Sequence, residues 1–368
     1  MVPITPIAMS VAVAPTLSAD SSVRTATLLE CTLRDGSYAI DYAFTAAESA
    51  AVALALESAG VRWIEIGHGL GIGASERGHG KSAATDLEYC EAVDAALTEA
   101  LWGVFFIPGI GTHEELAQAI DAGLDFVRIG TNVTEVARQA PFIKQARDAG
   151  IRAYSNLMKS YAVPPEEFAH YAAACRDLGA EGVSVVDSAG GMVPSEVAAY
   201  VHAARARCGD LPIGFHGHNN LGLANANALA ALEAGASIVD TTLNGLGRSA
   251  GNAITESLVL ILERCGFVTG IDPILIQDIG RRYIQPYLQH KGGLDPIDLT
   301  LGAARFHSSY LGEITAIAQE FGLDRRALVF AVGAVDAEHP TTQLMRDIAT
   351  RLAREAAQVR DYPVRVDL

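Results

Sequence analysis

Two histidines, His216 and His218, stand two positions apart in the segment FHGHNN. Side chains two positions apart in a strand point to the same side, so both imidazoles can bind one divalent cation. Asp35 follows an earlier apolar segment and can add a carboxylate. Such a set leaves open positions for substrate and water, and it suits Mn²⁺, Co²⁺, Mg²⁺ or Zn²⁺, in that order. Taken alone, the histidines are equally compatible with ordinary polar residues at a strand end, and Asp35 with a helix or turn cap.

Arg34 precedes Asp35 and supplies a local positive charge in a chain whose formal net charge is −16. A guanidinium beside a metal can bind a carboxylate or stabilise a developing enolate. The alternative is a salt bridge to Glu65, within a later apolar segment. Both roles are compatible, because a paired arginine is also a well-oriented one.

Eight short apolar segments must position these residues, and each is followed by a helical pattern. They cover residues 27–36, 63–69, 101–109, 126–131, 152–158, 182–190, 212–219 and 237–247. Alternating strands and helices with continuously apolar strands predict a parallel sheet, and eight units favour a closed (β/α)₈ TIM barrel of the α/β class. Polar residues gather at the strand ends, where barrel enzymes carry their chemistry, and residues 27–42 contain no GxGxxG motif of an open dinucleotide-binding sheet.

The pattern divides the chain into three parts: an N-terminal extension (1–26) expected to be poorly ordered, a catalytic barrel (27–268) and an α-helical C-terminal domain (269–368). The acidic balance argues against nucleic acid or an anionic membrane as a partner. No apolar run is long enough to span a membrane. Five scattered cysteines predict reduced thiols and a cytoplasmic protein.

Several motifs occur together in order: TLRDG (32–36), IEIGHGLGIG (64–73), TDLEY (85–89), FIPGIGT (106–112), DSAGG (187–191), HGHNN (216–220), NGLGRSAGN (244–252) and LGAARFHSSYL (301–311). Over residues 27–335 the chain thereby resembles the metal-dependent barrel superfamily that contains 2-isopropylmalate synthase, 3-hydroxy-3-methylglutaryl-CoA lyase and the 4-hydroxy-2-oxovalerate aldolases. It is most similar to the aldolases.

The resemblance implies a class II aldolase that cleaves or forms a 4-hydroxy-2-oxo acid from pyruvate, or a related 2-oxo acid, and an aldehyde. The metal, for which we expect Mn²⁺ before Co²⁺, Mg²⁺ or Zn²⁺, would be held by Asp35, His216 and His218. It would bind the 2-oxo acid while Arg34 stabilises the enolate. His216 and Ser188 would also lie at the 2-oxo acid, although Ser188 is equally suited to cap the next helix. The resemblance further implies a homodimer, or a heterotetramer with an acylating aldehyde dehydrogenase.

One departure from the family concerns the acid/base residues. The family carries a histidine where this chain has Tyr38, and a tyrosine where it has His307. A general base works best with a pKa near the working pH, which histidine meets unaided and tyrosine does not. We therefore expect His307 to deprotonate the C4 hydroxyl of the substrate, with Tyr38 hydrogen-bonding beside it.

Two alternatives remain at this point: an acyl-CoA-dependent condensing enzyme of the isopropylmalate or homocitrate synthase type, and an aldehyde-channelling subunit with reduced catalysis. The glycine-rich segment 67–80 is expected to form a substrate lid or tunnel wall, and His68 to line the site.

Overall fold

Eight parallel strands close into a barrel in a computed structural model that describes residues 24–288 and 296–360. The strands are β2 (Thr27–Glu30), β3 (Trp63–Ile66), β4 (Leu101–Phe106), β5 (Phe126–Asn132), β6 (Arg152–Met158), β7 (Gly182–Asp187), β8 (Ile213–Gly217) and β9 (Ile238–Thr241). They follow chain order, and β2 pairs with β9 to complete the ring. The eight strands and the TIM barrel predicted from the sequence are confirmed.

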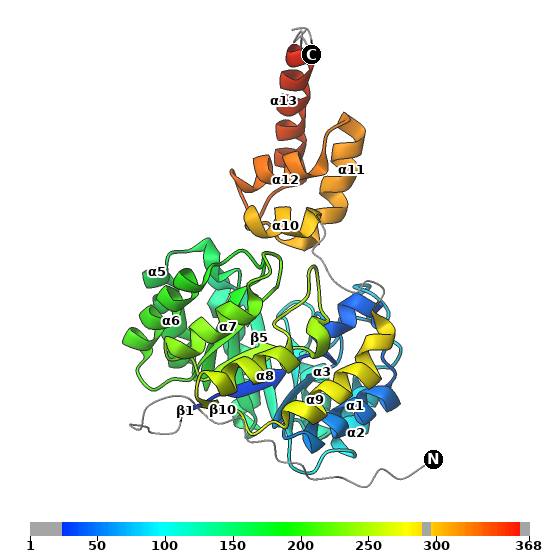
Figure 1. The fold of residues 1–368 in the computed structure, drawn as a ribbon, viewed down its shortest axis with the longest axis vertical. Helices are drawn as coiled ribbons and strands as arrows, with labels where there is room; N and C mark the ends of the chain where they lie inside the picture. Colours follow the sequence, from blue (N-terminus) through cyan, green and yellow to red (C-terminus); the bar gives the residue numbers. More distant parts are fainter. Residues whose placement is uncertain (1–23, 289–295, 361–368) are drawn as a thin grey trace.

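Helices follow the strands and cover the outside of the barrel (Figure 1). They are α1 (Ala46–Ser58), α2 (Asp86–Asp94), α3 (His113–Asp121), α4 (Ala140–Asp148), α5 (Pro165–Leu178), α6 (Pro194–Cys208), α7 (Ala224–Glu233) and α8 (Thr255–Arg264). Threonine at the N-cap and glutamate three residues later form capping boxes at α1, α2 and α3, which fixes where each helix begins. Gly179 ends α5 with a left-handed φ of 99°, which a Cβ would disfavour.

Short helical turns connect several of these elements. They are η1 (Asp35–Ile40), η2 (Val133–Gln139), η3 (Ser160–Ala162), η4 (Leu243–Gly245), η6 (Gln285–Tyr287), η7 (Ser308–Tyr310) and the π-helical turn η5 (Gly280–Ile284). The turn η1 begins at Asp35, only a few residues after β2 ends, so the predicted carboxylate ligand lies at the C-terminal end of that strand.

Residues 24–26 belong to the folded structure, whereas residues 1–23 of the predicted N-terminal extension lie outside the described residues. The strand β1 (Arg24–Thr25) pairs in parallel with β10 (Phe267–Val268), and the Ala26 amide donates to the Val268 carbonyl. The barrel unit therefore begins before residue 27.

The hydrophobic cores divide the chain later than the 268/269 boundary expected from the sequence. Ile276 and Ile279 of α9 (Pro273–Ile279) are buried in the same cluster as the barrel strands. A second cluster joins α10 (Pro296–Ala303), α11 (Leu311–Phe321), α12 (Arg325–Gly333) and α13 (Thr342–Arg360). These four helices form a separate unit beyond one end of the barrel (Figure 1). The apolar stripe of α9 faces the barrel, so α9 is part of the barrel unit.

Candidate metal centre and active site

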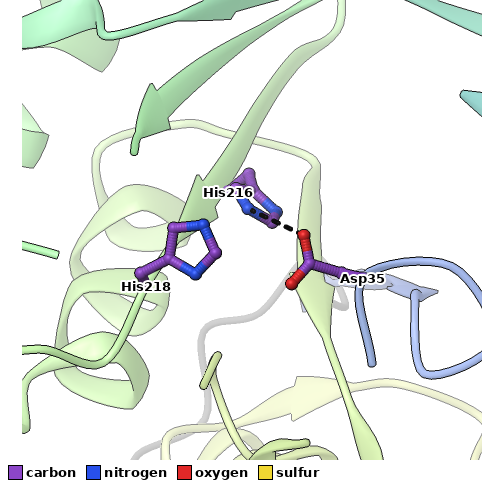
Figure 2. Close-up of side chains that lie close together, drawn as sticks. All are labelled: Asp35, His216 and His218. Atoms are coloured by element: carbon purple, nitrogen blue, oxygen red, sulfur yellow. Dashed lines mark ion pairs between the residues drawn. The ribbon is translucent and has the colours of Figure 1, made fainter. Parts of the chain in front are cut away.

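Asp35, His216 and His218 come together at the C-terminal mouth of the barrel. His216 lies on β8, His218 directly follows that strand, and Asp35 follows β2. One ligand atom from each residue lies within 4.8 Å of the others, and all three side chains are buried. Figure 2 shows the two imidazoles and the carboxylate facing one another, with His216 Nε2 3.9 Å from Asp35 Oδ2. The structure thus brings together the three residues that the sequence analysis proposed as metal ligands.

Each of the two imidazoles is oriented through its Nδ1 atom, which leaves its Nε2 atom for a metal. His216 Nδ1 lies 2.9 Å from Asp240 Oδ2, and His218 Nδ1 lies 3.3 Å from the Gly251 carbonyl oxygen. A carboxylate or carbonyl behind a histidine fixes its tautomer and orientation in metal sites. The donor set therefore fits a divalent cation.

The charge states of these residues also suit a cation. Burial lowers the pKa of His218 to about 4, with Asp35 opposing this effect and His216 adding to it, so the ring is neutral and able to bind a metal at neutral pH. Burial opposes ionisation of Asp35, but Arg34 and the two histidines hold the pKa of that carboxyl well below its usual range.

Asn252 is a residue of this centre that sequence reasoning missed. Its Nδ2 atom donates to Asp35 Oδ1 over 2.9 Å. Its own Oδ1 atom is buried and has no hydrogen-bond partner within the described part of the chain. An unsatisfied buried carbonyl beside a carboxylate is costly unless something else occupies the site. This atom adds to the fit with a hard cation.

A buried chain of ion pairs runs beneath the metal site from Arg34 to His216. Arg34 Nε donates to Glu65 Oε2 over 2.6 Å, and Arg128 donates to both oxygens of Glu65. Arg128 NH1 also donates to Asp240 Oδ2 over 2.5 Å, and Asp240 in turn holds His216. The expected Arg34–Glu65 salt bridge is thus present, and Arg34 simultaneously contacts Asp35 Oδ2 over 2.7 Å.

Tyr38, His307 and Arg248 lie together on another part of the site. Arg248 NH2 lies 3.1 Å from His307 Nδ1, and the Arg248 guanidinium carbon lies 5.4 Å from the centre of the Tyr38 ring. The arginine can only donate, so Nδ1 accepts and the neutral ring carries its hydrogen on Nε2. Burial, then Arg248 and Lys159, lower the pKa of His307 well below its usual value. Burial raises the pKa of Tyr38, so its hydroxyl stays protonated.

Seven of the predicted site residues line one pocket: Arg34, Asp35, Tyr38, Ser188, His216, His218 and His307. Arg248, Phe105, Asn156 and Met158 share its wall. Ser188 Oγ accepts from the Lys159 amide over 3.0 Å, which fixes this side chain at the end of β7. Asn156 adds a buried Oδ1 atom without a partner in the described residues.

His68 has a different place from the one expected. It is buried, stacks on Tyr42 with ring centroids 3.9 Å apart, and its Nε2 atom lies 3.2 Å from the Gly80 carbonyl oxygen. It is not among the residues that line the pocket. His68 therefore holds the glycine-rich segment together, and Gly69 and Leu70 of that segment form the pocket wall.

A family model described as HMGL-like matches residues 25–282, which is most of the chain. The carboxyl transferase domain of pyruvate carboxylase from Rhizobium etli has the same fold, with a TM-score of 0.71 at 18% identity, over 90% of this chain and 60% of that one. HMG-CoA lyase from Bacillus subtilis aligns with a TM-score of 0.63 at 20% identity, over 72% of this chain and 94% of that one. The fold and the site define a barrel lyase of the HMGL-like class.

Curated relatives narrow this class. A 4-hydroxy-2-oxovalerate aldolase from Carboxydothermus hydrogenoformans is 38% identical over 90% of this chain and 98% of its own length. 4-Hydroxy-2-oxovalerate aldolase 2 from Nocardia farcinica is 38% identical over 94% of this chain and 99% of its own length. The chain belongs to the 4-hydroxy-2-oxovalerate aldolase family of metal-dependent carbon–carbon lyases. No helix in the described ranges is both long and apolar enough to cross a membrane.

Proposed function

We propose that this protein cleaves a 4-hydroxy-2-oxo acid into pyruvate, or a related 2-oxo acid, and an aldehyde, and that it catalyses the reverse addition. The observation that carries this proposal is the buried Asp35–His216–His218 cluster with Arg34 2.7 Å from Asp35, at the mouth of a barrel of the aldolase family. A divalent cation held by this cluster, for which we propose Mn²⁺, would withdraw electrons from the 2-oxo group of the substrate.

In the cleavage direction, the C3–C4 bond breaks, its electron pair moves to C3, and the C4 hydroxyl gives up its proton as the carbonyl of the aldehyde forms. The enolate of the 2-oxo acid then takes a proton at C3. Arg34 is placed to stabilise the enolate oxygen, because Glu65 and Asp35 hold its guanidinium at the pocket wall. Ser188 and Asn156, which line the same pocket, would bind the 2-oxo acid end of the substrate.

His307 is the proposed acceptor of the C4 proton. Its lowered pKa keeps the ring neutral at neutral pH, so Nδ1 can accept a proton. The same shift makes the free imidazole a weaker base than the unperturbed histidine that the sequence analysis expected. The basic nitrogen is Nδ1, which accepts hydrogen bonds from Arg248 and from the Ser309 amide. The C4 hydroxyl of the substrate must therefore approach His307 on this side of the ring. Tyr38, which stays protonated and lines the same pocket, would donate a hydrogen bond to the same substrate oxygen.

An assay coupled to lactate dehydrogenase and NADH tests this function. The enzyme is stripped of metal with a chelator, and pyruvate release from 4-hydroxy-2-oxo acids is followed with and without added Mn²⁺. We expect release only with the metal. Release of CoA from an acyl-CoA plus a 2-oxo acid, without pyruvate formation, would instead show a condensing enzyme. If neither reaction is observed, the result favours the alternative of an aldehyde-channelling subunit with reduced catalysis.

We further infer that the protein works in the cytoplasm and hands its aldehyde to an acylating aldehyde dehydrogenase, either as a homodimer or as part of a heterotetramer. Membership of the aldolase family supports this inference. Co-expression with such a dehydrogenase, followed by size-exclusion chromatography, tests the association. A mass equal to that of the separate proteins would contradict the heterotetramer and leave the homodimer.

A further inference from the structure

Arg248 carries a charge in the pocket that the proposed reaction does not use. Its guanidinium donates from Nε to Ser308 Oγ over 2.8 Å and from NH2 to His307 Nδ1 over 3.1 Å. Both acceptors are neutral. In residues 24–288 and 296–360, no carboxylate forms an ion pair with it. A guanidinium has five N–H donors, so several remain for a ligand.

The other arginine of the pocket is in a different situation. Arg34 is matched by Glu65 and Asp35, and Arg128 beneath it by Glu65 and Asp240. The positive charge that faces the 2-oxo acid is therefore balanced by the protein. Arg248 adds a further positive charge to the same pocket, in a chain that is acidic overall. A half-buried cation on a pocket wall that pairs with no carboxylate of the described residues is suited to bind an anionic group of the substrate.

Arg248 also lies beside the residues assigned to the aldehyde half of the substrate. It contacts His307, the proposed acceptor of the C4 proton, and packs over Tyr38. A carboxylate bound to Arg248 would place a nearby hydroxyl close to His307 Nδ1, since the arginine NH2 is 3.1 Å from that atom. This juxtaposition matches a substrate whose C4 hydroxyl and second carboxylate are a few bonds apart.

We propose that Arg248 binds a second carboxylate of the substrate, so that this enzyme acts on 4-hydroxy-2-oxo dicarboxylic acids and releases an aldehyde that bears a carboxylate. This inference rests on the proposed aldolase function and names its substrate class. The planar guanidinium can bind a carboxylate through two parallel hydrogen bonds. An unsubstituted aliphatic aldehyde offers no counter-ion to Arg248.

Aldol addition of pyruvate to matched aldehydes tests the proposal. The readout is the ratio of kcat/KM for succinic semialdehyde to that for butanal, and for glyoxylate to that for acetaldehyde. We expect R248M to lower both ratios by roughly 10- to 100-fold. R248K should lower both ratios less, because lysine keeps the positive charge but cannot form two parallel hydrogen bonds to a carboxylate. Intrinsic differences in aldehyde reactivity cancel when each ratio is compared with that of the wild type.

R281M is the matched control, because Arg281 is an exposed arginine on η5 that pairs with Asp278 and does not line the pocket. Its ratios should equal those of the wild type. Ratios that are unchanged in R248M would overturn the proposal.

A binding measurement separates this proposal from the reaction itself. Isothermal titration of the Mn²⁺-loaded wild type compares 2-oxoglutarate with 2-oxopentanoate, which have equal chain length and differ by one carboxylate. We expect tighter binding of the dianion, and loss of this preference in R248M. Equal affinities in the wild type would overturn the proposal even if R248M failed to fold. If no aldehyde adds to pyruvate, the proposed function fails, but the titration still decides whether the anion site exists.

Discussion

His216 Nδ1 and Asp240 Oδ2 lie 2.9 Å apart, and the same Asp240 oxygen accepts a hydrogen bond from Arg128. The carboxylate therefore connects a proposed metal ligand to a buried arginine. Because Nδ1 is held in this way, the Nε2 atom of His216 faces Asp35 and the metal position (Figure 2). Asp240 and Arg128, which lie beneath the site, therefore set the orientation of the His216 ring.

Replacing Asp240 with asparagine should weaken metal binding. Asparagine has nearly the same shape but no charge, so it orients the His216 ring less firmly and leaves Arg128 with one fewer counter-ion. Loss of such a partner typically lowers metal affinity 10- to 100-fold. Titration of the metal-free protein with Mn²⁺ measures this change. The control is D210N at an exposed aspartate on the surface, and a D240N affinity equal to that of the wild type would contradict the role.

The sequence predicted the barrel and the cluster of three proposed metal ligands because both follow from strand and helix patterns along the chain. Strand and helix periods repeat along the chain, and polar residues cluster at the strand ends. Of the buried ion pairs, only Arg34–Glu65 was predicted. Arg128 and Asp240 were missed because they appear as single charged residues within apolar strands. The two residues lie 112 positions apart in the sequence, and only the closure of the barrel brings them into contact. A charged residue inside such a strand is the signal that could have found them.

Arg248 was missed for a related reason. It lies within NGLGRSAGN, a motif that supported the resemblance, but its partners His307 and Ser308 belong to the helical unit beyond the barrel. The packing of that unit over the strand ends brings these residues together, and no spacing along the chain encodes this contact.

Glu30 should make the stability of the barrel depend on pH. Burial raises the pKa of this carboxyl from an ordinary 4.5 to about 7, although hydrogen bonds from Thr32 and Thr255 oppose the effect. Between these two pH values the unfolded chain has released a proton that the folded chain keeps. Raising the pH through this window therefore lowers the free energy of unfolding, by up to about 1.4 kcal/mol per pH unit.

The variant E30Q removes this titration and retains groups that can hydrogen-bond to the two threonines. Urea denaturation at pH 5, 6 and 7 should show E30Q gaining stability relative to the wild type as the pH rises. E91Q, at an exposed glutamate, should follow the wild type at every pH. A constant difference between E30Q and the wild type across this range would show that Glu30 is ionised throughout.

Gly69 makes room for Tyr38 on the pocket wall. A Cβ atom at Gly69 would lie 2.4 Å from Tyr38 Cε2, so G69A must displace the tyrosine ring. We expect kcat/KM for cleavage to fall by roughly 10- to 100-fold, because small misplacements in an active site are costly. In a Y38A background the same substitution should have little further effect. The control is G312A, since a Cβ at Gly312 meets no atom within 4 Å. Equal losses from G69A in both backgrounds would contradict this relationship.

His307 is predicted to act as a base, and two substitutions separate this role from hydrogen bonding alone. H307A should lower turnover by roughly 10²-fold. H307Q retains an amide N–H near the position of Nε2 but is no base, so it should be as impaired as H307A. H339A, at the exposed His339 of the same helical unit, should leave turnover unchanged. Steady-state cleavage rates measure all three variants. Turnover of H307Q close to that of the wild type would show that His307 only donates a hydrogen bond, and unchanged turnover in H307A would remove it from the reaction altogether.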